Sequence, residues 1–371
     1  MMTLLVLAVL FVAFANGAND NFKGVATLFG SGAAGYGKAL GYATLATLAG
    51  SAAAMLLGGA LARSFSGKGL VPDFLANDCH FLIAVAGAAA LADLLATRLG
   101  MPVSTTHALV GGLTGAGLAA AGSGVHWAAL AKTLVYPLLL SPLVAILLTL
   151  LFYPLFRGAR RWLGIERETC LCVGHTIEAV DVGPSGAAVL RSTGVALGLG
   201  ELSSCRSRYS GTVLGVSAQH ILDRLHVLSA GAVSAARGLN DTPKIVALLL
   251  ASAPLLASTS SYAAVALVIA VGGLLAARRV AETMSHRITR MNDGQAFSAN
   301  LATALLVTAA SGLGMPVSTT HVSVGAIFGI GLVNGEARWA SILQILLAWV
   351  TTLPVAAALA AALYLLLTRL A

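Results

Sequence analysis

Seven residues, Met-Pro-Val-Ser-Thr-Thr-His, occur twice in the chain, at Met101–His107 and again 214 positions later at Met315–His321. In each copy a proline and three hydroxyl residues precede a glycine-rich apolar run. This order is typical of a capped helix N-terminus. Such a terminus offers free N–H groups and the positive end of the helix dipole, so each copy could bind an anion. Two copies facing each other would enclose that anion from two sides.

A second duplicated pattern is an Asn-Asp pair, Asn19–Asp20 in the first half and Asn240–Asp241 in the second. Each pair follows an apolar run, and we expect a helix break there, at 16–20 and 237–241. A carboxylate inside a membrane costs about 2.5–3.5 kcal/mol even on lenient insertion scales. Two at matching positions therefore call for a cation, a proton or a ligand. The alternative is that both carboxylates cap helix ends at the membrane surface.

The composition places these motifs in a membrane protein. Charged residues are 10% of the 371 residues and the mean hydropathy is +0.89, which leaves too few polar side chains to cover a soluble globule. Met2–Ala15 lacks a basic start and a cleavage site, so it is predicted to be a retained helix. The net charge of +8 is attributed to loop Lys and Arg under the positive-inside rule. Nucleic acid is excluded as a partner because no basic face is combined with aromatic residues.

The predicted fold is an all-α polytopic membrane protein made of two inverted repeats with broken or re-entrant helices, about 10–12 membrane segments in all. The repeats span 1–156 and 216–371, and a small polar insert, 157–215, joins them. In the insert, the alternation at Ile177–Val182 and the turn at Gly183–Gly186 predict a β-hairpin. Its basic start favours the cytoplasmic side. Duplicated halves with matching helix interruptions indicate a secondary transporter with its site at the bilayer midplane.

The chain resembles the inorganic phosphate transporter (PiT) family, whose signature is Gly-Ala-Asn-Asp-Val-Ala-Asn-Ala. Gly17–Gly24 reads Gly-Ala-Asn-Asp-Asn-Phe-Lys-Gly, and Gly238–Ile245 reads Gly-Leu-Asn-Asp-Thr-Pro-Lys-Ile. The Pro-Val-Ser-Thr-Thr-His copies match that family's second motif without change. The resemblance covers both halves but not the insert, and it implies a twelve-segment inverted-repeat fold that carries phosphate with sodium. It assigns phosphate to the hydroxyls and amides of Ser104, Thr105, Thr106, Ser318, Thr319 and Thr320, and sodium to oxygens of Asn19, Asp20, Asn240 and Asp241.

Lys23 and Lys244 stand where the family has its second Asn, each three residues after its Asp and on the same helical face. An amide oxygen can ligate sodium, whereas an ammonium group only donates hydrogen bonds. The two lysines also balance the two aspartates. Our hypothesis is that tethered ammonium groups replace bound sodium, so that transport is sodium-independent or proton-coupled, and that both lysines belong to the phosphate site. The alternative is that both lysines extend to the membrane surface.

The predicted function is secondary active transport of inorganic phosphate across the plasma membrane, as a multi-pass protein, by alternating access. Phosphate is favoured over sulfate because hydrogen phosphate needs an acceptor for its O–H, which Asp20 or Asp241 could supply. Arsenate and sulfate are the expected competitors. The alternatives are a sodium-coupled phosphate symporter, a permease for sulfate or another oxyanion, and an anion channel. A homodimer in the lipid bilayer is left open.

His107 and His321 close the two hydroxyl motifs and are candidate proton carriers. The alternative is that each ring is hydrogen-bonded to the backbone in the first turn of its helix. Ser104 and His107 could also act as nucleophile and base. We expect no enzyme, because no orienting acid is evident and the whole motif is duplicated.

Three of the four cysteines, Cys170, Cys172 and Cys205, lie in the insert and are expected to be free thiols in a reducing compartment. Together with His175 they form a weak zinc candidate, since Cys-x-Cys is a less specific pattern than Cys-x-x-Cys. The sequence indicates no other cofactor than a sodium ion or a proton as coupling ion.

Overall fold

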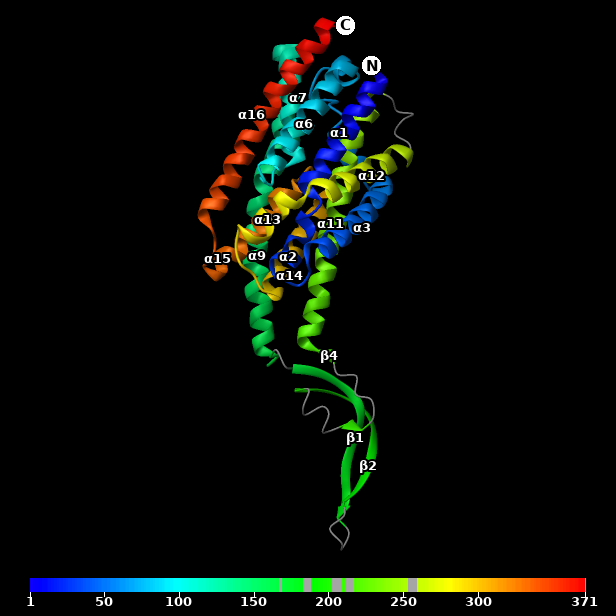
Figure 1. The fold of residues 1–371 in the computed structure, drawn as a ribbon, viewed down its shortest axis with the longest axis vertical. Coiled ribbons are helices and arrows are strands. Elements are labelled where there is room, and N and C mark those ends of the chain that lie inside the picture. The colour runs from blue at the N-terminus through cyan, green and yellow to red at the C-terminus, as the bar shows by residue number, and fades with distance from the viewer. Residues whose placement is uncertain (167–168, 183–187, 202–208, 211–215, 253–258, 371) are drawn as a thin grey trace. The chain divides into compact units, whose positions relative to one another are not determined.

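The computed structural model describes residues 1–166, 169–182, 188–201, 209–210, 216–252 and 259–370 (Figure 1). The chain divides into two compact units. The first unit contains Met1–Tyr153 together with Leu228–Ala371, so both predicted repeats contribute to one body. The second unit is Pro154–Val227 and contains the polar insert.

The elements of the first half precede the insert. They are α1 (Met2–Asp20), the 3-10 turn η1 (Lys23–Val25), α2 (Ala26–Gly30), α3 (Tyr36–Leu57), α4 (Gly59–Ser64), α5 (Asp73–Ala76), α6 (Cys79–Arg98), α7 (Thr105–Ala121), η2 (Gly122–Gly124), α8 (Trp127–Leu130), the π-helical turn η3 (Ala131–Val135) and α9 (Tyr136–Trp162). Those of the second half are α11 (Ala218–Ser252), α12 (Thr259–Ala276), α13 (Arg278–His286), α14 (Asp293–Gly312), α15 (Thr319–Asn334) and α16 (Trp339–Leu370).

Among the described residues, 6 helical segments are long and apolar enough to cross a membrane. They are Met2–Gly30, Tyr36–Leu57, Cys79–Arg98, Trp127–Trp162, Thr259–Ala276 and Trp339–Leu370. The polytopic all-α prediction is therefore confirmed. Fewer helices qualify than the segments expected, because the helices next to the motifs are short or polar. α7 has 17 residues and α15 has 16, and α11 carries charged side chains in its middle.

The predicted helix breaks are only partly present. α1 continues through Asn19 and Asp20 and ends before Asn21, where η1 follows. α11 runs unbroken through Asn240 and Asp241, with Pro243 inside it, so the break predicted there is wrong. A proline removes one helix hydrogen bond without having to end the helix. The polar side chains of this stretch find partners on other segments and need no local unwinding.

The hydroxyl motifs do form the predicted helix starts. Ser104 is the N-cap of α7 and its Oγ accepts from His107 N at 3.3 Å. Ser318 caps α15 in the same way, with 3.1 Å to His321 N. In both cases the cap residue is extended and the residues just before it lie outside any helix, so their backbone carbonyls stay free of helix bonds.

Apolar packing surrounds these helix starts in two clusters. One cluster joins α1, α6, α7 and α16, which pack on one another, and the other joins α2, α13, α14 and α15 (Figure 1). α1 also packs against α12, and α12 against α3. The apolar neighbours of the signature motifs belong to both clusters, Leu239 and Ile245 to the first and Phe22 and Val25 to the second, so the core helps to fix the motifs.

Close contact between α7 and α16 depends on glycines one turn apart. A Cβ at Gly111 would lie 2.4 Å from Leu353 O, and one at Gly115 would lie 1.9 Å from Ala357 O. This is the small-xxx-small pattern by which membrane helices approach closely. Since α7 begins at the hydroxyl motif, this contact also holds the motif in place.

We expect Gly115→Ala to lower the free energy of unfolding by about 3 kcal/mol or more, because the added Cβ meets backbone that cannot move aside. Gly37→Ala is the matched control: it is exposed in α3, with nothing within 4 Å of an added Cβ. The control should be neutral or gain about 0.5–1 kcal/mol. Thermal unfolding of the purified protein in detergent measures both. Equal midpoints for the two variants would contradict this packing.

The second unit contains the expected hairpin. β1 (Thr169–Val182) pairs antiparallel with β2 (Ala188–Glu201), from Thr169 opposite Glu201 to Val182 opposite Ala188. The short strands β3 (Tyr209–Ser210) and β4 (Val216–Ser217) also pair with β1. The predicted turn at Gly183–Gly186 lies outside the described residues.

The cysteine predictions for the insert need correction. Cys170 is a buried free thiol, but Cys172 is disulfide-bonded. Cys172 therefore offers no thiolate to a metal. His175 is exposed while both cysteines are buried, because strand alternation turns its side chain to the other face. The described residues contain no group of three potential metal ligands, and Cys205 lies outside them.

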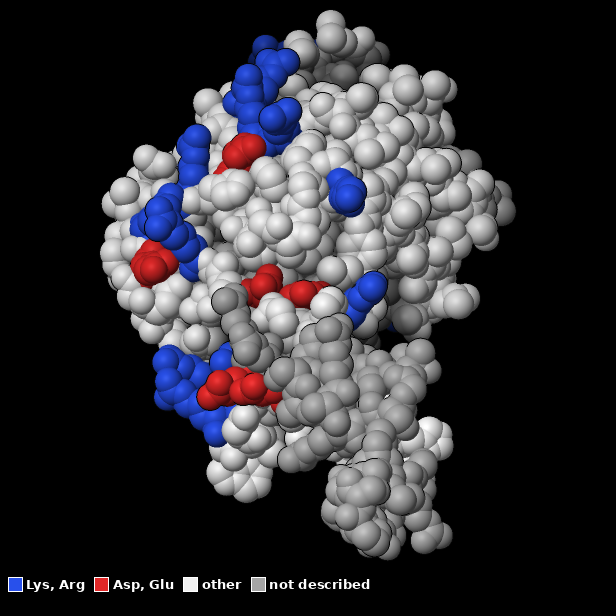
Figure 2. Space-filling model, turned by 60° about the horizontal axis from the view of Figure 1, so that its bottom comes forward, with Lys and Arg blue, Asp and Glu red and all other residues white. Residues whose placement is uncertain are grey.

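The surface carries few charges for its area. Figure 2 shows Lys and Arg side chains gathered in a few groups, with wide uncharged areas between them. Exposed arginines concentrate around α13 and the segment that follows it, at Arg278, Arg279, Arg287, Arg290 and Arg338. Uncharged surface of this extent suits contact with lipid, and clustered arginines suit the membrane boundary.

Candidate functional site

The four predicted motif segments meet in the interior of the first unit. Each lysine connects both copies of the hydroxyl motif. It donates to the Val carbonyl just before the N-cap in one copy and to the third hydroxyl residue of the other copy. The two sets are Lys23 with Val103 and Thr320, and Lys244 with Val317 and Thr106.

Four oxygens surround the ammonium group of Lys23. Its Nζ lies 2.8 Å from Asn19 Oδ1, 2.6 Å from Val103 O and 2.6 Å from Thr320 Oγ1, and it forms an ion pair with Asp20. The residue is 3% exposed. An ammonium group has three N–H donors, so these oxygens satisfy it fully. A carboxylate, an amide, a carbonyl and a hydroxyl are also the ligands that a hard cation takes.

The surroundings of Lys244 are similar but looser. Its Nζ donates to Thr106 Oγ1 at 2.8 Å and to Val317 O at 2.7 Å, and lies 3.6 Å from Asp241 Oδ1. The ring of Phe65 lies beside it, 5.7 Å from Nζ to the ring centroid. Lys244 is 1% exposed, so neither lysine reaches the surface and the alternative of surface lysines is wrong.

The signature asparagines hold the extended segments before the helix starts. Asn19 Nδ2 donates to Thr97 Oγ1 at 2.8 Å and to Met101 O at 3.0 Å. Asn240 Nδ2 donates to Val317 O at 3.2 Å, and its Oδ1 accepts from Ser311 Oγ at 3.1 Å. Thr97 and Ser311 are 214 positions apart, as the motif copies are. The duplication thus extends to partners that the sequence alone did not indicate.

The first threonine of each motif donates to a carboxylate. Thr105 Oγ1 donates to Asp93 Oδ2 at 2.5 Å and accepts from Asn16 Nδ2 at 3.0 Å. Thr319 Oγ1 lies 3.5 Å from Asp241 Oδ2, in a longer contact. The two halves therefore differ here: the second threonine contacts a signature aspartate, and the first contacts an aspartate outside any motif.

Two buried charges in the site were not found from the sequence. Asp93 on α6 is fully buried, and Arg237 on α11 is 1% exposed. Arg237 donates to Asn21 Oδ1 at 3.3 Å and Asn16 Oδ1 at 3.2 Å, and its Nε lies 3.6 Å from Asp241 Oδ2. Neither Asp93 nor Arg237 has a residue of its own type at the matching position of the other half, so the duplication of the sequence did not point to them. The described buried Asp, Lys and Arg residues are Asp20, Asp93 and Asp241 with Lys23, Lys244 and Arg237, three of each sign.

The two motif histidines lie against each other. The ring centroids of His107 and His321 are 4.4 Å apart, and the ring of Trp349 stacks on His321 at 3.8 Å. Trp349 Nε1 donates to Pro102 O at 2.9 Å, which ties α16 to the first motif. His321 Nδ1 is 3.4 Å from Leu138 O, so that ring also contacts backbone.

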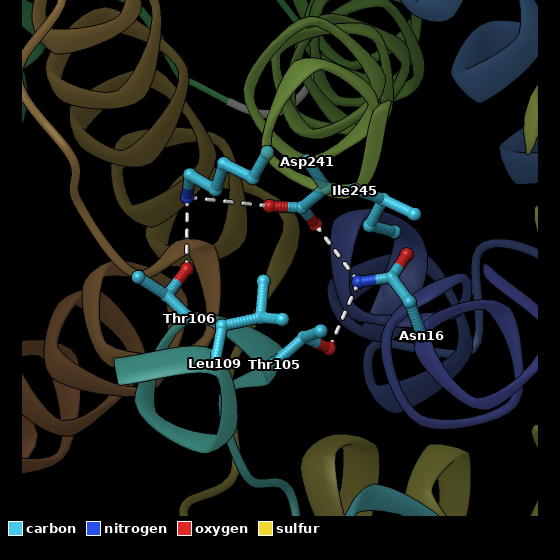
Figure 3. Close-up of a pocket in the computed structure, with 7 residues that line it drawn as sticks. Asn16, Thr105, Thr106, Leu109, Asp241 and Ile245 are labelled. Carbon is cyan, nitrogen blue, oxygen red and sulfur yellow. Dashed lines mark hydrogen bonds and ion pairs between the residues drawn. The ribbon is translucent and has the colours of Figure 1, made fainter. Parts of the chain in front are cut away.

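A narrow pocket, too small to admit a water molecule in this conformation, lies on the Lys244 side of the site. Figure 3 shows the Asn16 amide between Asp241 and Thr105, with Asn16 Nδ2 donating to both. On its other side Asp241 pairs with Lys244. The residues lining the pocket are Asn16, Thr105, Thr106, Leu109, Asp241, Lys244 and Ile245. The pocket thus combines two hydroxyl groups at a helix N-terminus with a cation, which is a set of donors suited to an oxyanion.

A membrane-embedded helical protein with balanced charges and two helix N-termini in its interior has the features of a carrier for a small polar ion. A family model described as the phosphate transporter family matches residues 16–360. The chain belongs to that family.

Known proteins resemble the chain over nearly its full length. A protein of Pyrococcus abyssi that carries the name phosphate permease is 29% identical over 95% of this chain and 94% of its own. A protein of Rhizobium meliloti that carries the name low-affinity inorganic phosphate transporter is 29% identical over 97% of this chain and 94% of its own. A solved structure titled "The sodium-dependent phosphate transporter" aligns with a TM-score of 0.76 over 100% of this chain and 99% of that chain, at 22% identity. That structure has the same fold.

Proposed function

We propose that the protein carries inorganic phosphate across the plasma membrane by alternating access, without sodium and with protons as the coupling ion. The names of the relatives support phosphate as substrate. The observation that carries the proposal is the pair of lysines, each of which joins the two hydroxyl motifs at one buried site. The similar solved structure is of a sodium-dependent transporter, so a sodium-coupled symporter is the second candidate.

Phosphate would bind where the lysines now contact hydroxyl groups. Thr106 and Thr320 each accept from an ammonium group, and both hydroxyls could instead donate to a phosphate oxygen while the lysine pairs with its charge. Asp20 and Asp241 would accept the O–H of hydrogen phosphate. The remaining proposed ligands are Ser104, Thr105, Ser318 and Thr319, at the N-termini of α7 and α15.

Sodium independence follows from the oxygens around Lys23. They are the donors a sodium ion would use, and a covalently attached ammonium already neutralises the Asp20 carboxylate there. An ion entering this place would have to expel a fixed charge. Asn19 and Asp20 then stabilise Lys23, Asp241 stabilises Lys244, and Asn240 positions Asp241 and Val317. His107 and His321 are proposed to relay protons between the membrane faces and the site.

Movement of the site between the two membrane faces is proposed to rock the helices of one half against those of the other. The lysine contacts cross between the halves, so breaking and remaking them accompanies this motion. A channel is disfavoured because the buried ion pairs would have to separate for every ion that passes.

The proposal is tested by uptake of labelled phosphate into proteoliposomes, with choline in place of sodium and with or without a pH gradient. We expect saturable uptake that needs no sodium and rises when the outside is acidic. Arsenate should compete well and sulfate weakly. Uptake that stops in choline would favour the sodium symporter, and single-channel currents would favour a channel.

A further inference from the structure

Asp93 is the buried carboxyl group that the duplicated motifs do not account for. It lies on α6, and both its side-chain oxygens are shielded by protein. Oδ2 accepts from Thr105 at 2.5 Å, and Oδ1 has no hydrogen-bond partner among the described residues. None of the ion pairs within the described part of the site includes Asp93. A buried carboxylate with an unpartnered oxygen is costly, whereas the neutral acid costs much less.

The second half has no such group. The position 214 residues after Asp93 is Val307, although the neighbouring threonines correspond as Thr105 and Thr319. Thr319 contacts Asp241, which already pairs with Arg237 and Lys244. Asp93 is therefore an addition to the duplicated framework, placed against one hydroxyl of the proposed phosphate site.

We propose that Asp93 is the proton-carrying residue of the transporter. The hydroxyl of Thr105 then donates to bound phosphate only when Asp93 is protonated. The inference rests on the phosphate transport proposed above and names the residue that links it to protons. A threonine hydroxyl has one hydrogen to donate and two lone pairs. When Asp93 is ionised, that hydrogen is held by Asp93 Oδ2, and Asn16 donates to one lone pair.

Protonation of Asp93 reverses this bond. The proton taken from water binds Oδ2, and the new O–H donates to the second lone pair of Thr105 Oγ1. The hydroxyl hydrogen then turns to an oxygen of phosphate, and no further proton is transferred. Loss of the proton on the opposite face returns the hydroxyl to Asp93 and weakens phosphate binding. One proton therefore accompanies each phosphate through this residue.

Other ionisable groups near Asp93 do not replace it in this role. Asp20 is paired with Lys23, and Asp241 with Lys244 and Arg237, so each of these groups already has a partner of opposite charge. The remaining ionisable groups on the elements packed against α6 are His107 on α7, Arg278, Arg279, Glu282 and His286 on α13, Tyr364 and Arg369 on α16, and Asp73 on α5. Arg279 bonds Arg98 O at the end of α6, and Tyr364 lies near Asp78 at its start.

The test compares wild type, Asp93→Asn and Asp73→Asn in proteoliposomes without sodium. The amide that Asp93→Asn introduces can donate to Thr105 as the protonated acid would, so exchange of labelled phosphate for internal phosphate should persist. Proton entry with phosphate, followed by an internal pH dye, should be lost. The KM of wild type should rise up to about tenfold per pH unit as one proton is lost. The KM of Asp93→Asn should lack the part of this rise with pH that comes from the protein's proton. Phosphate titrates equally in all three samples, so their difference isolates the protein's proton. Asp73 is exposed, and its variant should match wild type.

Proton entry by Asp93→Asn at the wild-type ratio to phosphate would overturn the inference while leaving phosphate transport intact. Absence of labelled uptake by wild type in every condition would instead refute the proposed function and, with it, the inference. If Asp93→Asn fails to fold, infrared difference spectra of wild type decide. Phosphate binding should produce the C=O band of a newly protonated carboxyl group, and Thr105→Val should lose it. No such band in wild type would overturn the inference.

Discussion

Phosphate uptake by the double variant Lys23→Asn, Lys244→Asn should become sodium-dependent. The variant restores the asparagine of the family signature in both halves. Removing the lysines leaves Asp20 and Asp241 without their ammonium partners and frees the oxygens that surround Lys23. Breaking a buried ion pair from one side costs about 3–5 kcal/mol. A sodium ion bound to the same oxygens would recover much of that loss.

The expected result is a fall of uptake in choline by about 100-fold or more, since 3 kcal/mol corresponds to a factor above 100. Uptake should recover with increasing sodium and should follow a saturation curve. Sodium should also raise the thermal midpoint of the variant and leave that of wild type unchanged, because a bound ion stabilises the folded state.

The control for this result is Lys38→Asn with Lys68→Asn, which removes the same charge from exposed positions. It should transport without sodium, as wild type does. Two results would show that the lysines do not stand in for sodium. One is sodium-dependent uptake by the control, and the other is normal, sodium-independent uptake by the double variant in choline.

The duplicated parts of the site could be predicted from the sequence. Two copies of each motif show that a residue is placed by function, because chance does not repeat Lys23 at Lys244. The structure brings all four segments together, as the copies suggested. It also adds Thr97 and Ser311, which sit in ordinary apolar helices and whose types are too common to signal a role.

The single residues of the site could not be predicted. Asp93 lies within an apolar helix whose other residues are unremarkable by type, and Arg237 stands at the position that matches Asn16 in the first half. A count of charges limited to the motifs gave two of each sign, whereas the described interior has three. Whether a buried charge is stable depends on its partners on other helices, and the distances to those partners are set by packing. The continuity of α11 could not be predicted for the same reason, since its polar residues form hydrogen bonds with other segments.

Asp241→Asn should be the most damaging single change in the site. Asp241 is the carboxylate nearest to both Arg237 and Lys244, at 3.6 Å from each. Its neutral substitute leaves two buried cations facing each other with one acceptor group between them. We expect a loss of about 3–5 kcal/mol in unfolding free energy and transport reduced by about 100-fold or more.

Adding Arg237→Gln to Asp241→Asn should recover part of the lost stability. The double variant removes one charge of each sign and so leaves one unpaired buried cation, Lys244, where Asp241→Asn alone leaves two. Arg237→Gln alone should cost less than Asp241→Asn, because Asp241 keeps Lys244 as a partner. Thermal unfolding of all four proteins in detergent gives the coupling energy between the two residues.

Additive losses in this cycle would mean that Arg237 and Asp241 act independently and that charge balance does not govern the site. A favourable coupling would show that the fixed cations and anions of the interior form one neutral set. A dianionic phosphate would then enter that set only with compensating positive charge. This requirement gives a physical reason for a coupling ion. The lysine charges are already balanced by Asp20 and Asp241, so the positive charge that compensates phosphate must come from outside the protein.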